Sequence, residues 1–164
     1  MLRGVISVVP GYAGGNPPAG GPNPTYEQVC SGETGHAEVT KIEYDPAQVS
    51  FRTLLTVFFA THDPTTVNWQ GPDVGTQYRS IILYTTEKQK EEAGVFIKEV
   101  DGSSLEGGKV VTEVKPLEKF YEAENYHKDY FAKNPEASYC QLVVSPKVEK
   151  VQKQFAELLK NNQP

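Results

Sequence analysis

Short β-branched runs alternate with amphipathic segments along this chain, and that alternation restricts the fold more than any other feature. The strongest helical pattern places apolar side chains at i, i+3, i+4, i+7 and i+8 over 51–59, after Ser50 as N-cap and before Asp63-Pro64. A second helix should follow Thr86 as its cap. A third should start with Ser145 as N-cap and Pro146 at its first helical position. Apolar runs predict strands over 5–9, 38–44, 80–84 and 110–114.

Strands that interleave with helices in 164 residues predict an α+β fold with two layers, in one domain spanning 1–164. Two segments rich in Gly and Pro, 11–24 and 65–79, should be long irregular loops. We also expect a turn over 101–108 and an irregular, aromatic-rich stretch over 116–137. Because loops of this length in a compact domain commonly carry function, the site should lie on them.

The composition excludes several classes of protein. Nine Tyr, seven Phe and one Trp are too many aromatics for a disordered chain. A net charge of −5 argues against nucleic acid or an anionic membrane as the main partner. No apolar run approaches the ~18 residues of a membrane span, and the first ten residues do not form a convincing signal peptide. We therefore expect a soluble cytoplasmic protein with reduced thiols.

The histidines and cysteines raise two chemical possibilities, a metal site and a cysteine nucleophile. His36, His62 and His127 are widely spaced, and the sequence has neither His-x-x-x-His nor Cys-x-x-Cys, which disfavours a metal site. Cys30 or Cys140 could pair with a histidine as a nucleophile, but each is better explained as a small buried hydrophobe. Cys140 lies in an apolar, strand-like run, whereas Cys30 precedes a Ser-Gly turn and stays open.

Three polar residues are ambiguous when each is considered alone. Tyr26 and Tyr78 would by default pack their rings and find one partner for each hydroxyl. Glu38 begins a strand directly after Gly35-His36-Ala37. Taken alone, it would be a surface glutamate.

The order of the longer motifs removes much of this ambiguity. They are Gly-Tyr-Ala-Gly-Gly at 11–15, Asn-Pro-Thr-Tyr-Glu-Gln-Val-Cys-Ser-Gly-Glu-Thr-Gly-His-Ala-Glu at 23–38, His-Asp-Pro-Thr at 62–65, Gln-Gly-Pro-Asp-Val-Gly-Thr-Gln-Tyr-Arg-Ser at 70–80 and Phe-Tyr-Glu-Ala-Glu-Asn-Tyr-His-Lys-Asp-Tyr at 120–130. Together they resemble the A-type peptide methionine sulfoxide reductases over nearly the whole chain. The resemblance implies a ferredoxin-like reductase core with a mixed sheet, long irregular loops and a C-terminal helix.

The resemblance also implies an activity and a set of site residues. The activity is reduction of the S epimer of methionine sulfoxide, free or in proteins, which repairs oxidative damage. In the family a cysteine thiolate attacks the sulfoxide sulfur, and a glutamate protonates the departing oxygen. By motif match that glutamate is Glu38, while Tyr26, Tyr78 and Asp73 bind and polarise the oxygen. Two phenols aimed at a partly negative oxygen act like an oxyanion hole. Glu38 should be buried, because burial raises the pKa of a carboxyl and keeps its proton near neutral pH.

One family motif is absent from the sequence. The family nucleophile lies in Gly-Cys-Phe-Trp, whose aromatics form the pocket for the substrate methyl group, and by family spacing it would lie about ten residues before Met1. We therefore expect that the family's first strand and most of its first helix are missing. Cys140 is expected to be structural, and substitution of the nucleophile by Cys30 is disfavoured. The alternative to an active reductase is a truncated, inactive remnant that at most binds methionine sulfoxide.

The resemblance implies no bound cofactor and no metal. An external thiol, thioredoxin or dithiothreitol, would reduce the sulfenic acid left on the cysteine, since no cysteine follows Cys140 to resolve it. Oxidised proteins, free methionine sulfoxide and thioredoxin are the expected partners, and we expect a monomer.

Overall fold

The structure is a computed structural model that describes residues 1–16, 23–102 and 108–160. Its main sheet has the strand order β2-β1-β7 and is antiparallel, with β1 (Val5–Ala13), β2 (Ala37–Tyr44) and β7 (Phe120–Glu122). A second sheet pairs β5 (Ile81–Tyr84) with β6 (Glu113–Pro116) in parallel, and α3 (Glu87–Gly102) connects them. A hairpin joins β3 (Trp69–Gln70) to β4 (Asp73–Val74).

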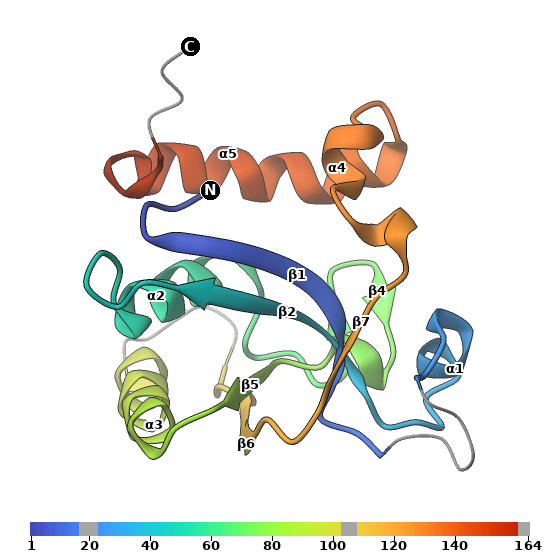
Figure 1. Cartoon of the computed structure of the whole chain (residues 1–164), viewed down its shortest axis with the longest axis horizontal. Coiled ribbons are helices and arrows are strands. Elements are labelled where there is room, and N and C mark those ends of the chain that lie inside the picture. The colour runs from blue at the N-terminus through green and yellow to red at the C-terminus, as the bar shows by residue number, and fades with distance from the viewer. Residues whose placement is uncertain (17–22, 103–107, 161–164) are drawn as a thin grey trace.

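The helices cover these sheets from several sides. Figure 1 shows α5 (Ser145–Gln154) lying along β1 and β2, with α2 (Phe51–Thr61) behind β2 and α3 beside β5. The amino terminus meets the 3₁₀ turn η4 (Ala156–Leu158), where the Arg3 N–H donates to the Leu158 carbonyl at 2.7 Å. The remaining short helices are α1 (Tyr26–Cys30), α4 (Tyr130–Lys133), the 3₁₀ turns η1 (Thr76–Tyr78) and η2 (Asn125–His127), and the π-helix η3 (Cys140–Val144).

The apolar periodicity of 51–59 is confirmed as the origin of α2. Ser50 is its N-cap, and the Ser50 hydroxyl accepts from the Thr53 N–H at 3.0 Å. Leu55 is buried in a cluster with Ile82, Ala93 and Phe96, which joins α2 to β5 and α3. Burying such an aliphatic side chain contributes roughly 1.5–3 kcal/mol, so this cluster holds the parallel sheet against its helices. Thr86 also caps its helix as predicted, since its hydroxyl accepts from the Gln89 N–H.

Several predicted boundaries are wrong where tertiary contacts override local signals. The loop predicted over 11–24 starts later, because β1 continues through Pro10-Gly11 to Ala13. Gly11 permits this: a Cβ there would lie 2.3 Å from the Phe120 ring, so only glycine lets β7 pair so closely. Residues 17–22 of that loop lie outside the described residues.

The predictions nearer the carboxyl terminus also need correction. The strand expected over 110–114 is β6 at 113–116, because the Val110 and Val111 N–H groups bond to Asp101 and Pro64 instead of to β5. The turn expected over 101–108 begins inside α3, and 103–107 lie outside the described part. The stretch 116–137 contains β7, η2 and α4, and 65–79 contains the β3–β4 hairpin and η1.

The run around Cys140 is helical and not strand-like. η3 leads directly into α5, so Ser145 lies within a continuous helix and is not its N-cap. Pro146 is the second residue of α5 and not its first. Cys140 has no exposed surface, as expected for a structural thiol.

The mixed α/β class is confirmed, whereas the ferredoxin-like two-layer sandwich and the single-domain boundary stay predictions. In the described segments, no helix has the length and apolar character needed to cross a membrane.

Candidate functional site

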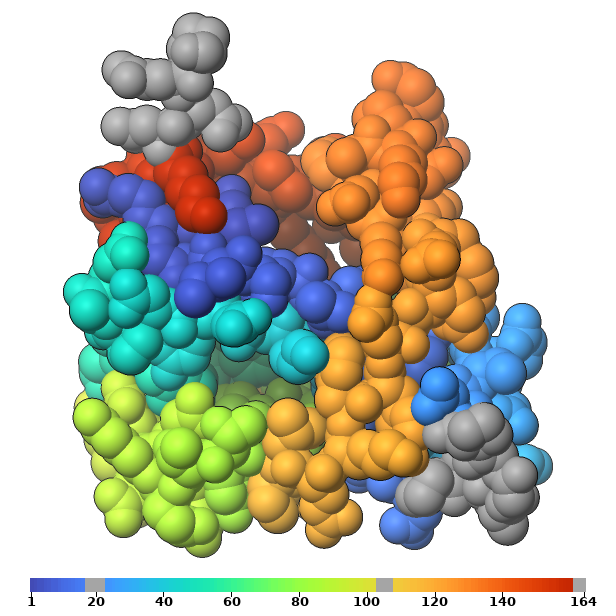
Figure 2. Space-filling view, in the orientation of Figure 1, coloured from blue at the N-terminus to red at the C-terminus, as the bar shows by residue number. Residues whose placement is uncertain are grey.

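A cavity of about 750 Å³ lies between the antiparallel sheet, the parallel sheet and α2. Figure 2 shows the surface hollowed between β2 (cyan), the β5–α3 segment (green) and the β6–β7 segment (orange). Apolar side chains of α2 and β5 line much of the cavity, and its polar lining residues include Glu38, Asp73, Tyr78 and Tyr139. A volume of this size is typical of a small-molecule site.

Glu38 stands at the start of β2, opposite Tyr12 of β1 in the sheet register. Its side chain is half-buried, and its Oε1 atom has no exposed surface and no hydrogen-bond partner among the described residues. Burial raises the pKa of Glu38, and the negative charge of Asp73 raises it further, while interaction with the Tyr78 hydroxyl lowers it in part. The net pKa is raised, which favours a protonated carboxyl.

Tyr78 and Tyr26 extend this group of polar side chains away from Glu38. The hydroxyl of Tyr26 interacts with the Cys30 thiol and with the Tyr78 hydroxyl, and these contacts together with burial raise the pKa of Tyr26. Burial and the charge of Glu38 raise the pKa of Tyr78. Both phenols therefore keep their protons well above neutral pH and can donate hydrogen bonds to a ligand oxygen.

Asp73 lies on β4, and its Oδ2 atom accepts a hydrogen bond of 2.8 Å from the Tyr139 hydroxyl. Burial and this bond raise the pKa of Tyr139. The structure thus brings Glu38, Tyr78 and Asp73 to one cavity and places Tyr26 against Tyr78. Tyr139 completes the group, although sequence reasoning did not select it.

A second set of contacts holds the backbone and the ring of Tyr26 in place. The Glu124 carboxylate accepts from the Tyr26 backbone N–H at 2.9 Å and from the Tyr12 hydroxyl at 2.7 Å. The His127 ring packs on the Tyr26 ring with centroids 5.0 Å apart. Sequence reasoning missed both Glu124 and the helix α1 that carries Tyr26. The signal for α1 was present, because Thr25 and Gln28 form a capping box.

The cysteines and histidines considered for a nucleophile or a metal site lie in different parts of the fold. Cys30 is half-buried beside Tyr26, and Cys140 is fully buried. His62 bonds to the Phe58 carbonyl and the Ser80 hydroxyl, while Nδ1 of His36 accepts from the Gly15 N–H at 3.0 Å. In the described ranges, no three His, Cys, Asp or Glu side chains are grouped so that they could hold a metal ion.

The family model for peptide methionine sulfoxide reductase matches residues 1–159. This chain belongs to the peptide methionine sulfoxide reductase family. The MsrA peptide methionine sulfoxide reductase of Nautilia profundicola is 61% identical over 149 residues, which are 91% of this chain and 82% of that protein. The MsrA of Saccharolobus solfataricus is 55% identical over 159 residues, 97% of this chain and 86% of that protein.

Two solved structures agree with this family membership. Reduced Mxr1 from Saccharomyces cerevisiae superposes with a TM-score of 0.74 at 38% identity, covering 83% of this chain and 75% of that one. Methionine sulfoxide reductase A of Corynebacterium diphtheriae gives 0.69 at 35% identity, covering 82% and 66%. The reductase is an oxidoreductase that acts on peptide methionine sulfoxide, and nothing in these similarities favours the remnant that only binds it.

Proposed function

We propose that this reductase acts on L-methionine (S)-S-oxide, free and in proteins, and that Glu38, Tyr26, Tyr78 and Asp73 handle the sulfoxide oxygen. The single observation that carries the proposal is the half-buried Glu38 carboxyl, whose pKa is raised, in the same cavity as the Tyr78 hydroxyl. A sulfoxide oxygen bears partial negative charge and accepts hydrogen bonds. Neutral donors in a partly dry cavity therefore stabilise it, and they do so more strongly as its charge grows.

The division of labour follows from the chemistry of each group. Glu38 in its acid form transfers its proton to the oxygen as the S–O bond breaks. Tyr26 and Tyr78 donate hydrogen bonds to the same oxygen. Asp73, beside Glu38, raises the pKa of the Glu38 carboxyl and so helps it retain the proton until it is needed.

The reducing electrons come from a thiolate that attacks the sulfoxide sulfur. In the net reaction the sulfoxide becomes the thioether and the attacking thiol becomes a sulfenic acid. An external dithiol such as thioredoxin or dithiothreitol then reduces the sulfenic acid, becoming a disulfide and releasing water. The resemblance assigns the thiolate to a Gly-Cys-Phe-Trp motif, which the sequence does not contain. We further propose a single-domain, cytoplasmic, monomeric enzyme with a ferredoxin-like core and no bound cofactor.

A turnover assay with separated sulfoxide epimers tests this proposal. The chain is extended at residue 1 with the Gly-Cys-Phe-Trp segment of a relative and assayed with dithiothreitol. We expect turnover of the S epimer only, and at least a tenfold loss for Glu38→Ala, since acid catalysis contributes roughly 10²-fold or more. Glu91→Ala, on the exposed surface of α3 and outside the cavity lining, is the matched control. An unchanged rate for Glu38→Ala would exclude the assignment, and sulfoxide binding without turnover by the unextended 164-residue chain would favour the remnant.

A further inference from the structure

We propose that Arg79 is a positioning residue for the sulfoxide site, because its guanidinium ties together the backbone segments that carry Glu38 and Tyr78. The catalytic consequence rests on the function proposed above, but the structural role does not. Arg79 directly follows Tyr78 and precedes β5. Among the described residues, its hydrogen bonds and ion pairs are with Thr76, Gly14, Gly35 and Glu113 and not with Glu38, Asp73 or a tyrosine hydroxyl, so its influence on the site passes through the main chain.

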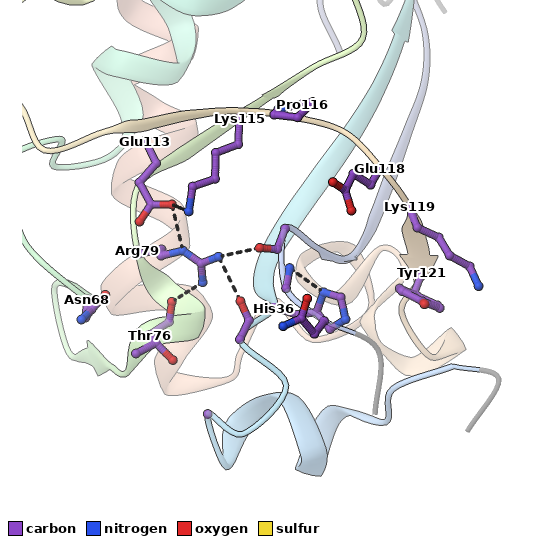
Figure 3. Close-up of a pocket in the computed structure, with 15 residues that line it drawn as sticks. His36, Asn68, Thr76, Arg79, Glu113, Lys115, Pro116, Glu118, Lys119 and Tyr121 are labelled. Carbon is purple, nitrogen blue, oxygen red and sulfur yellow. Dashed lines mark hydrogen bonds and ion pairs between the residues drawn. The ribbon is translucent and has the colours of Figure 1, made fainter. Parts of the chain in front are cut away.

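The guanidinium bonds to main-chain carbonyls of three separate segments (Figure 3). One terminal nitrogen donates to the Thr76 carbonyl at 2.9 Å, two residues before Tyr78. The other donates to the Gly35 carbonyl at 3.0 Å and the Gly14 carbonyl at 3.4 Å. Gly35 lies three residues before Glu38, and Gly14 follows the end of β1. A single planar cation thus fixes the spacing between the loops that start β2, end β1 and present Tyr78.

Glycine residues in two of these segments allow the backbone to orient those carbonyls toward Arg79. Gly14 and Gly35 have positive φ angles of 80° and 64°, which turn their carbonyls toward the guanidinium and are accessible mainly to glycine. The adjacent Gly15 packs against the backbone of Gly35, where a Cβ would lie 2.2 Å from the Gly35 carbonyl carbon. The close approach of these two segments therefore brings both carbonyls within reach of one arginine.

The charge of Arg79 is balanced from the far side of the contact. Its Nε lies 3.6 Å from a Glu113 carboxylate oxygen, and Lys115 lies 2.7 Å from the same oxygen. Burial alone would raise the pKa of Glu113, but Lys115 and Arg79 lower it, so the group is a carboxylate. The nearby His36 stays neutral, since burial and the charge of Arg79 lower its pKa. An arginine fork that is only 12% exposed is thereby held by four partners.

A lysine could supply the charge at this position but not the geometry. Its ammonium is compact and cannot present a planar fork to three carbonyls and a carboxylate at once. Arg79 also forms a wall between the sulfoxide cavity and a second cavity of about 700 Å³, drawn in Figure 3. That second cavity gives a small cation a route to the guanidinium position.

The test is the titration of the Glu38 carboxyl by ¹³C NMR in the full chain, assigned with Glu38→Gln. Arg79→Lys keeps the charge and loses the fork. We expect the pKa of Glu38 in this variant to fall toward its ordinary value by at least half a unit, about a threefold change in proton affinity. Arg52→Lys is the matched control, because Arg52 forms a half-exposed ion pair with Glu99 on the helical surface, and it should leave the titration unchanged.

Two further measurements separate positioning from general stability. In Arg79→Ala, millimolar methylguanidinium should restore the wild-type titration of Glu38, whereas methylammonium should not. A lowered melting temperature with an unchanged Glu38 titration in both variants would overturn the proposal. In the wild-type protein, the Arg79 Nε–H and terminal N–H signals should exchange slowly with water, and fast exchange would overturn the clamp even if neither variant folds. Because no readout requires turnover, absence of reductase activity would count against the proposed function and not against the role of Arg79.

Discussion

The hydrogen bond from Tyr12 to Glu124 supports the position of Tyr26, and removing it should have a measurable cost. Tyr12 is 1% exposed, and its hydroxyl donates to Glu124 at 2.7 Å. The other Glu124 oxygen accepts from the Tyr26 N–H, so the carboxylate links β1 to the first turn of α1. Tyr12→Phe deletes the donor without enlarging or filling the space around the ring.

The magnitude follows from the charge and the exposure of Glu124. Hydrogen bonds to charged groups contribute about 1.5–3 kcal/mol to stability. The Glu124 side chain is 34% exposed, so water replaces part of the lost bond. We therefore expect Tyr12→Phe to lower the free energy of unfolding by about 1.5 kcal/mol at pH 7.

The cost should also depend on pH in a defined direction. Burial alone would raise the pKa of Glu124, but the bonds from Tyr12 and the Tyr26 N–H lower it below its usual range. A lowered carboxyl pKa stabilises the fold above the unfolded value of about 4.3, and this stabilisation is lost as the pH falls through the folded value. The penalty of Tyr12→Phe should therefore be full at pH 7 and smaller near pH 3.5.

Urea unfolding of the wild-type protein and of Tyr12→Phe at pH 7 and near pH 3.5 measures this change in the free energy of unfolding. Tyr44→Phe is the matched control. Within the part of the chain that the structure describes, the Tyr44 hydroxyl accepts only a 3.4 Å hydrogen bond from Gln89, so its loss should cost less than about 0.5 kcal/mol. Equal costs for the two variants, or a Tyr12→Phe penalty that does not change between the two pH values, would show that the Tyr12–Glu124 bond does not have this role.

Three further predictions concern the glycine packing, the histidine and the thiols near the site. Gly15→Ala should destabilise the fold by about 3 kcal/mol or more, because the added Cβ would clash with the backbone of Gly35 and His36. Gly94→Ala, in a helix with open space around it, should stabilise the fold by about 0.5–1 kcal/mol, and thermal unfolding of both variants measures the difference. Burial lowers the pKa of His36, so the wild-type protein should lose stability between pH 7 and pH 5 as the unfolded state gains a proton there. His36→Asn keeps an acceptor for the Gly15 N–H but does not titrate, so it should lose less stability over this range. Equal losses would exclude a contribution of His36 to the pH dependence. In native protein an aromatic disulfide reagent should modify the half-buried Cys30 and reach the fully buried Cys140 only after unfolding, and early labelling of Cys140 would contradict the packing.

The parts of the fold that the sequence predicted are those whose signals are local. The 51–59 helix has a complete apolar face and a serine cap, and both act within a few residues. The end of β1 was missed because Pro10 and Gly11 normally interrupt strands. Here Gly11 instead makes room for Phe120, and that contact joins positions far apart in the chain. The 139–144 run was misassigned because apolar runs of that length suit strands and buried helices equally.

In the candidate site, too, residues in recognisable motifs were predicted, whereas residues marked only by contacts distant in sequence were not. Glu38, Tyr26, Tyr78 and Asp73 lie in long motifs, so a resemblance could select them, although nothing local said that Glu38 leaves the surface. Tyr139 and Glu124 are distinguished only by partners 66 and 98 residues away. Arg79 stands in a selected motif, but its role depends on carbonyls of three segments that only the fold brings together.

The central claim, that protonated Glu38 receives the sulfoxide oxygen, is tested most directly by the pH dependence of ligand affinity. Binding of L-methionine (S)-S-oxide to the chain can be followed by NMR chemical shifts from pH 4 to 8, with methionine as the control ligand that lacks the oxygen. Sulfoxide affinity should weaken as Glu38 ionises, whereas Glu38→Gln, which keeps a neutral donor, should bind independently of pH. A wild-type affinity that stays constant or strengthens as Glu38 ionises would contradict the claim.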